Sequence, residues 1–171
     1  CDTNKRLPAF HYDFNNFALC LVVDYVDDKT KALIQKTVCD MSDSNHYTIN
    51  WLPMRWMVNK TRFEWTSDNK YLDTITHCKE TIAKATNADG GVEDRLPHGM
   101  SFNLQYDLAT VAVLQFLRVH GEEIELSKEL GFLLNAVAPD GDINYQGRGT
   151  NQIFAWGLWI YLLASSCHNE A

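Results

Sequence analysis

This sequence has little basic charge, few cysteines and no long apolar run. Its 15 lysines and arginines face 22 aspartates and glutamates, and the formal charge of -7 argues against binding a nucleic-acid backbone as the main activity. Five cysteines without a CxxC pair exclude a disulfide-dense mini-domain and the usual zinc and thioredoxin motifs. We expect no membrane span, because the longest apolar segments are interrupted by Asp24 and Asp27 or by Arg118 and His120.

Metal-binding patterns are also lacking. The six histidines form no HExxH motif and no other clustered ligand spacing. The string from Asp140 to Asn144 begins like a calcium loop, but Tyr145 replaces the glycine of the sharp turn and Asn151 stands where a bidentate glutamate is needed. We expect a tight turn there, and neither a metal nor a cofactor.

What the sequence does contain is the composition of one ordinary globular domain. The 171 residues are 46% hydrophobic, which is enough for a sizeable core, and no linker or strict repeat divides them. We therefore predict a single domain over residues 1–171. Because the chain begins with Cys1 rather than Met, a signal peptide could have been removed, and we expect a secreted or periplasmic protein.

Apolar residues recur at helical spacing in most of the longer segments, and strict alternation is scarce. This pattern predicts an all-α fold of antiparallel helix hairpins. In the first helix, the apolar residues from Phe14 to Tyr25 form one stripe that we expect to be buried. Asp27 and Asp28 predict the N-cap of the second helix, Ser67 and Asp68 that of the fourth, and Ser101 that of the fifth. The expected helices cover residues 14–26, 29–41, 52–62, 69–86, 101–120, 127–138 and 150–167.

Polar residues gather where the fifth expected helix begins. His98 lies in a loop beside Gly99, which lets backbone and ligand approach each other closely. Asn103, Gln105 and Tyr106 then interrupt an otherwise apolar segment, and their polar groups need either packing partners or a ligand. Tyr106 is a candidate for proton transfer, with a core tyrosine as the equally open alternative.

Further polar clusters stand at the two ends of the chain. Glycines flank Arg148, and Asn151 and Gln152 follow at the start of the last helix. A guanidinium beside helix-terminal amides suits a carboxylate or another anion, although Arg148 could instead connect neighbouring loops. Asn15 and Asn16 form a polar spot at the start of the first helix.

The middle of the chain interleaves aromatic, amide and arginine side chains. Trp51, Arg55, Asn59 and Arg62 lie within a short stretch. Such a mixture suits sugar rings, whose apolar faces stack on aromatic rings while their hydroxyls form hydrogen bonds. We expect these four residues to bind substrate, together with Gln105 and the polar residues before the last helix.

Taken together, several segments resemble a known family. They are Asp13–Phe17 (DFNNF), Trp51–Arg55 (WLPMR), Arg62–Leu72 (RFEWTSDNKYL), His98–Tyr106 (HGMSFNLQY) and Pro139–Gly141 (PDG). In this order they resemble the helical toroid domain of polysaccharide lyases, the alginate lyase, heparinase and chondroitin lyase superfamily. Its members have paired helices around a ring, an Asn near an early helix, and a Gly-Ser-x-x-x-Gln-x-x-Tyr-like segment that opens a later helix.

The resemblance implies a partial (α/α) toroid that acts on an acidic, uronate-containing polysaccharide by β-elimination. Asn15 or Asn16 would neutralise the uronate carboxylate and acidify the adjacent C–H. His98 would remove the proton, and Tyr106 would protonate the leaving oxygen. Arg148 would contact the substrate at a subsite.

Two features depart from the family pattern. Tyr106 is followed by Asp107 where many relatives carry histidine, and 171 residues are about half of a usual toroid. The chain could therefore be a fragment that a further domain or chain completes. It could also be a shortened relative, a non-catalytic helical module that binds a glycan or a protein. A third hypothesis is an acidic inhibitor of a basic enzyme.

Overall fold

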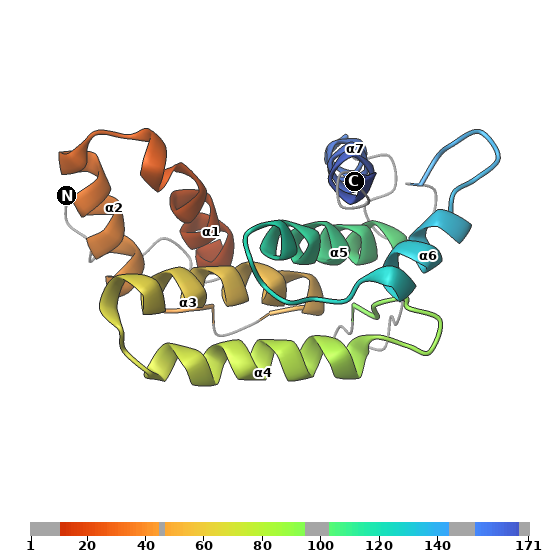
Figure 1. Ribbon diagram of the computed structural model, residues 1–171. Coiled ribbons are helices and arrows are strands. Elements are labelled where there is room, and N and C mark those ends of the chain that lie inside the picture. Colours follow the sequence, from red (N-terminus) through yellow and green to blue (C-terminus); the bar gives the residue numbers. More distant parts are fainter. Residues whose placement is uncertain (1–10, 45–46, 95–102, 144–152, 168–171) are drawn as a thin grey trace. The chain divides into compact units, whose positions relative to one another are not determined.

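The computed structural model describes residues 11–44, 47–94, 103–143 and 153–167, and this part of the chain is helical (Figure 1). It contains no strand beyond an isolated bridge between Thr86 and Val92. The elements are α1 (Tyr12–Val22), η2 (Val23–Tyr25), α2 (Asp28–Asp40), η3 (Ile49–Trp51), α3 (Leu52–Thr66), α4 (Lys70–Ala85), α5 (Leu104–Val119), α6 (Ser127–Asn135) and α7 (Phe154–Cys167). The all-α prediction is confirmed. Within the described residues, no helix is long and apolar enough to cross a membrane.

The chain divides into two compact units. Unit 1 comprises Cys1–Tyr47 and Met54–Glu80, and unit 2 comprises Thr48–Pro53 and Thr81–Ala171. The helices α3 and α4 therefore contribute residues to both units. That residues 1–171 form a single domain stays a prediction.

Unit 1 packs α1, η2 and α2 around a small apolar core. Cys20, Val23, Ile34, Val38 and Val58 are its buried members. The second helix begins as expected, since the side chain of Asp27 accepts the backbone N–H of Thr30 at 2.9 Å. This bond satisfies one of the free donors at the helix start and fixes the turn after η2.

The orientation of α1 differs from the prediction. Most of the apolar stripe expected to be buried faces outward instead: Phe14, Leu21, Val22 and Tyr25 are exposed, whereas Phe17 is half-buried and packs against the core. The residues of α1 and η2 that are buried are Asp13, Asn16, Cys20 and Val23. The physical reason is that Asp13 forms a buried ion pair with a residue of α3, which turns the polar side of α1 inward.

The helix α3 is longer than the predicted 52–62, because it continues to Thr66. Pro53 is tolerated because it lies in the first helical turn, where backbone N–H groups have no intrahelical acceptor. Ser67, directly after the helix, has a left-handed φ of 56°, which prevents the helix from continuing. Asp68 then accepts the backbone N–H of Lys70 at 3.0 Å, so the predicted capping of α4 is confirmed.

Unit 2 is built around α5. Leu104, Leu108, Val111 and Leu117 of this helix are almost fully buried, and α5 contacts η3, α6 and α7. The N-cap is not the expected Ser101, which lies outside the described residues. It is Asn103, whose side-chain oxygen accepts the N–H of Tyr106 at 3.4 Å.

A tight turn joins α4 to the segment that leads toward α5. The backbone N–H of Asn87 donates to the carbonyl of Gly91, and Gly90 has a φ of +99°. A Cβ at Gly90 would lie 2.4 Å from the backbone oxygen of Lys128, so this turn lies directly on the first turn of α6. Only glycine fits there.

Gly90→Ala should therefore be more destabilising than Gly121→Ala. Both glycines have positive φ, but a Cβ at Gly121 would meet nothing within 4 Å. We expect Gly121→Ala to lower the free energy of unfolding by about 1 kcal/mol through backbone strain, and Gly90→Ala by roughly 1–3 kcal/mol more through the clash. Urea unfolding of both variants measures this, and equal losses would contradict the close contact with α6.

Candidate functional site

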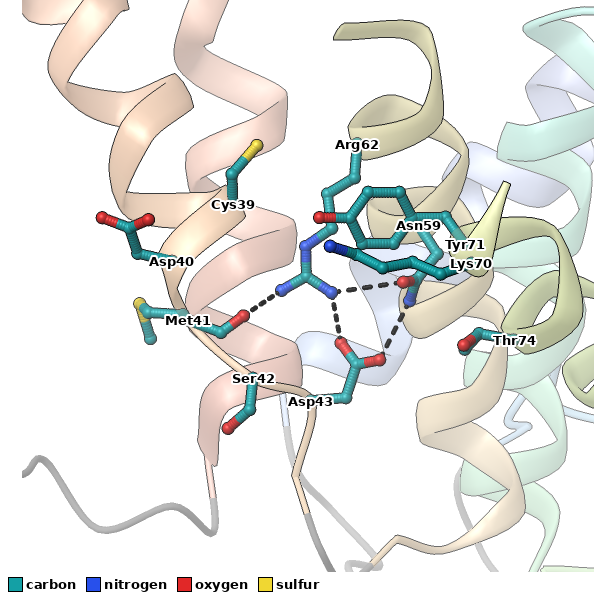
Figure 2. Close-up of a pocket in the computed structure, with 10 residues that line it drawn as sticks. All are labelled: Cys39, Asp40, Met41, Ser42, Asp43, Asn59, Arg62, Lys70, Tyr71 and Thr74. Atoms are coloured by element: carbon teal, nitrogen blue, oxygen red, sulfur yellow. Dashed lines mark hydrogen bonds and ion pairs between the residues drawn. The ribbon is translucent and has the colours of Figure 1, made fainter. Parts of the chain in front are cut away.

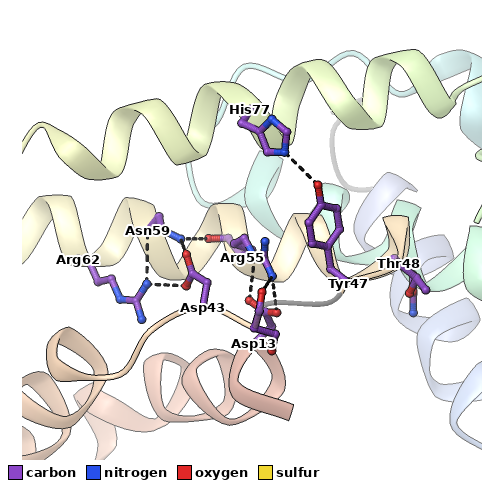
Figure 3. Close-up of polar contacts among 10 residues, drawn as sticks. Asp13, Asp43, Tyr47, Thr48, Arg55, Asn59, Arg62 and His77 are labelled. Atoms are coloured by element: carbon purple, nitrogen blue, oxygen red, sulfur yellow. Dashed lines mark hydrogen bonds and ion pairs between the residues drawn. The ribbon is translucent and has the colours of Figure 1, made fainter. Parts of the chain in front are cut away.

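The centre of unit 1 is a buried ion pair between α1 and α3 (Figure 3). Arg55 donates from Nε to Asp13 Oδ1 at 3.0 Å and from Nη2 to Asp13 Oδ2 at 2.9 Å. Its Nη2 also donates to the backbone oxygen of Ser44 at 2.8 Å. The side chains of Arg55 and Asp13 are 8% and 1% exposed. This two-pronged geometry holds the guanidinium in one orientation.

A partly exposed tyrosine extends this pair toward the surface. The guanidinium of Arg55 lies 4.6 Å from the ring centroid of Tyr47. The hydroxyl of Tyr47 is 3.1 Å from Nε2 of His77, which lies on the exposed side of α4 (Figure 3). A continuous series of polar contacts therefore runs from His77 to the buried Asp13.

A second arginine connects α3 to the end of α2. Arg62 donates from Nε to the backbone oxygen of Val38 at 2.9 Å and from Nη2 to that of Met41 at 2.6 Å. Its Nη1 reaches Asp43 at 2.6 Å and Asn59 at 3.2 Å (Figure 2). Asn59 in turn donates to Asp43 at 3.1 Å. The arginine thus binds carbonyl oxygens at the C-terminal end of α2, where partners are missing within the helix.

This network forms one wall of a pocket of about 310 Å³ (Figure 2). The pocket carries both signs of charge, with Arg62 and Lys70 near Asp40 and Asp43. The Nζ of Lys70 pairs with Asp68 at 2.8 Å. The pocket lining consists of Cys39, Asp40, Met41, Ser42, Asp43, Asn59, Arg62, Lys70, Tyr71 and Thr74. Hydroxyl, carboxylate and cationic groups on one wall suit a small, highly polar ligand such as a sugar unit.

The thiols of unit 1 are not activated for nucleophilic chemistry. Burial raises the pKa of Cys20 to about 11 and that of Cys78 to about 12. Burial also raises the pKa of Cys39, which lines the pocket. The thiolate is the reactive form of cysteine, so these three side chains are present as unreactive thiols near neutral pH.

The polar cluster of unit 2 lies in the first turn of α5. Gln105 and Asp107 are buried, and Tyr106 between them is half-buried. Asp107 Oδ1 accepts the backbone N–H of Val92 at 3.0 Å. Burial raises the pKa of Asp107 to about 8. This carboxyl group is therefore mostly protonated at neutral pH, and it joins α5 to the end of the Gly90 turn.

Both ends of the segment that contains His98 are anchored in unit 2. At one end, Asp94 is buried and its Oδ1 accepts the backbone N–H of Asn50 at 3.4 Å. At the other end, the buried Asn103 caps α5. The bond from Val92 to Asp107 brings the two ends together. The segment between them, with His98, lies outside the described residues.

The structure places only some of the predicted site residues. Asn15 is half-buried on α1, and Asn16 is fully buried, with no hydrogen-bond partner for either side-chain polar atom within the described chain. Trp51 is buried in η3 of unit 2. The residues outside the described ranges are His98, Arg148, Asn151 and Gln152.

Three predicted substrate ligands do come together, namely Arg55, Asn59 and Arg62 on one face of α3. The sequence reasoning missed their partners Asp13 and Asp43. These are 42 and 19 residues away from Arg55 and Arg62, so no local pattern could reveal the pairing. In the described part of the chain, no group of three or more His, Cys, Asp or Glu residues could hold a metal ion.

No known family, curated protein or solved structure matches the chain.

Proposed function

We propose that this chain is a polysaccharide lyase-like domain, a partial (α/α) toroid that binds an acidic, uronate-containing polysaccharide and acts by β-elimination. The observation that carries the proposal is the half-buried Tyr106 in the first turn of α5, with buried Asn103 and Gln105 beside it. A half-buried tyrosine that is held by a rigid helix suits the role of a proton donor. A secreted or periplasmic location accords with such a substrate.

Asn16 supports the proposal from unit 1. Its amide is fully buried, and neither Nδ2 nor Oδ1 has a hydrogen-bond partner within the described residues. Buried amides are almost always paired, and an unpaired one costs about 1–3 kcal/mol. In the proposed reaction, the amide of the half-buried Asn15, with the buried Asn16 beside it as the alternative, neutralises a uronate carboxylate, which acidifies the C–H next to it.

The proposed proton transfers belong to the neighbourhood of α5. His98 takes the proton from the acidified carbon, and Tyr106 gives a proton to the leaving oxygen. The anchors at Asp94 and Asn103 fix where the segment with His98 leaves and rejoins the fold. Arg148, Asn151 and Gln152 contact the substrate before the last helix.

The acidic chain needs a focused cationic site to bind an acidic polymer. Its formal charge is -7, so general attraction is absent and local groups must supply it. Arg62 and Lys70 at the pocket of unit 1 are such groups. Arg62 already pairs with Asp43, so the positive and negative charges of this pocket nearly cancel. The pocket therefore suits a sugar hydroxyl as much as a carboxylate.

Tyr106→Phe tests the reaction. Incubation of the protein with alginate, hyaluronan, chondroitin or heparin should raise absorbance near 235 nm as an unsaturated sugar forms. Removing the hydroxyl should lower the rate on the active polymer by at least about 100-fold, because general acid catalysis contributes about 10²–10⁴. Tyr25→Phe is the control, since Tyr25 is exposed. No absorbance change on any polymer would refute the enzymatic function.

The second candidate is a non-catalytic module that binds a glycan or a protein. The outward apolar face of α1 favours it, because exposed apolar patches mark interaction surfaces. Glycan-array binding without turnover would support a glycan module. Absence of any glycan signal would favour a protein partner.

A further inference from the structure

The helix α7 has an apolar stripe on its outward face. Ile153, just before the helix, is 86% exposed, and Trp156, Ile160 and Leu163 are 42%, 65% and 38% exposed. Their spacing of three, four and three residues places them in one row along the helix. Gly157 and Ala164 lie in the same row and are also exposed. The row contains no charged residue.

The other face of α7 is already used within unit 2. Ala155, Trp159 and Leu162 are buried, and α7 packs against α5, with the ring of Tyr161 6.5 Å from that of Phe116. The sequence Phe154–Cys167 carries no charge on either face. A helix that is apolar all round is normally covered on both sides. At 14 residues it is also too short for a membrane span.

We propose that the outward stripe of α7 binds the same stripe of a second copy of this chain, so that the protein forms a two-fold dimer. The exposed parts of the stripe amount to roughly 500 Å² per copy, from the usual areas of such side chains. A pair of copies would then bury about 1,000 Å², which is where specific interfaces begin. This area places the contact at the small end of specific interfaces.

Charge and symmetry favour a second copy. Each chain carries a formal charge of -7, so two copies repel each other at long range, and a contact through the uncharged stripe brings no further like charges together. An antiparallel pair of helices makes the contact self-complementary, with Trp156 of one copy near Leu163 of the other. Ile160 then lies near the two-fold axis. Gly157 and Ala164 allow the two helices to approach closely.

Ile160→Asp tests the dimer, because it places two carboxylates near the axis. Sedimentation equilibrium of the wild type should show a monomer–dimer equilibrium with a dissociation constant on the order of 10 μM, as expected for a small interface. Ile160→Asp should weaken the dimer at least about 30-fold, since like charges in contact cost several kcal/mol. Leu134→Asp is the matched control on α6, with Leu134 56% exposed in the same unit, and it should leave the equilibrium unchanged.

A charge-complementation experiment identifies the contact. An equal mixture of Ile160→Asp and Ile160→Lys should dimerise more tightly than either variant alone, because opposite charges then meet at the axis. If circular dichroism shows that these variants do not fold, Ile160→Cys replaces them and should form a disulfide-linked dimer on mild oxidation, whereas Leu134→Cys should not. The proposal would be overturned if the wild type stayed monomeric at about 500 μM, well above the expected dissociation constant. It would also be overturned if substitutions at Ile160 left the monomer–dimer equilibrium unchanged.

Discussion

Asp13→Ala is expected to lower the free energy of unfolding by about 3–5 kcal/mol, because it leaves the guanidinium of Arg55 buried without its charge partner. Arg55 donates two hydrogen bonds to this carboxylate, and both side chains are almost inaccessible to water. The loss is then mainly the cost of an uncompensated buried charge rather than of the missing contacts. Urea unfolding followed by circular dichroism measures it.

Two comparisons separate this effect from a general loss of packing. The pair of Lys31 and Asp24 is also close, at 2.6 Å, but Asp24 is 75% exposed, so Asp24→Ala should cost less than about 1 kcal/mol. The double change Asp13→Leu with Arg55→Met removes both charges, and it should recover most of the stability lost by Asp13→Ala. A double variant that is no more stable than Asp13→Ala would contradict the buried-charge explanation.

Asp107→Asn is expected to stabilise the protein increasingly as pH rises from about 4 to 8. In the folded state, burial raises the pKa of Asp107 to about 8, whereas an unfolded Asp titrates near 4. Between these values the folded state binds more protons, so the Asp107 protein loses stability as pH rises. The Asn side chain of the variant cannot titrate, but it keeps an oxygen that accepts the N–H of Val92. The Asp107→Asn variant therefore does not lose stability in this way as pH rises. Each unit of pKa difference corresponds to about 1.4 kcal/mol. The difference in unfolding free energy between Asp107→Asn and the wild type should therefore reach several kcal/mol near pH 8.

The measurement is the unfolding free energy of both proteins at several pH values. Asp89→Asn is the control for the removal of one carboxyl group, because Asp89 is exposed in the turn close to Val92. Asp107→Ala removes the acceptor as well, so it should be less stable than Asp107→Asn at every pH. A constant difference between wild type and Asp107→Asn would mean that Asp107 is ionised in the folded protein.

The helix positions followed from the sequence because they depend on local periodicity. The bounds of α2 and α4 lie within one residue of the prediction, and the side chains of the expected Asp27 and Asp68 accept backbone N–H groups where these helices begin. The rotation of α1 about its axis did not follow from the sequence. Its apolar stripe favours burial of one face, whereas the ion pair with Arg55, which is distant in the sequence, buries the other. The length of α3 was underestimated since its Trp-rich sequence hides the periodicity.

The candidate site was predictable in part for the same reason. Arg55, Asn59 and Arg62 share a helical face, so their grouping is visible in the spacing of the sequence. Asp13 and Asp43 come from other segments, and only the folded chain brings them to α3. The depth of Asp107 in unit 2 was equally hidden, because an acidic residue in a first helical turn is usually solvated.

The inverted α1 has a consequence for how unit 1 selects a single structure. This helix has two faces that compete for the interior, one polar around Asp13 and one apolar around Leu21. Apolar contacts alone would be compatible with several rotations of the helix about its axis. The two hydrogen bonds from the Arg55 guanidinium to Asp13 can form in only one of them. The carboxylate of Asp13 therefore fixes the rotation of α1 about its axis. It thereby determines which side of the helix is exposed to other molecules.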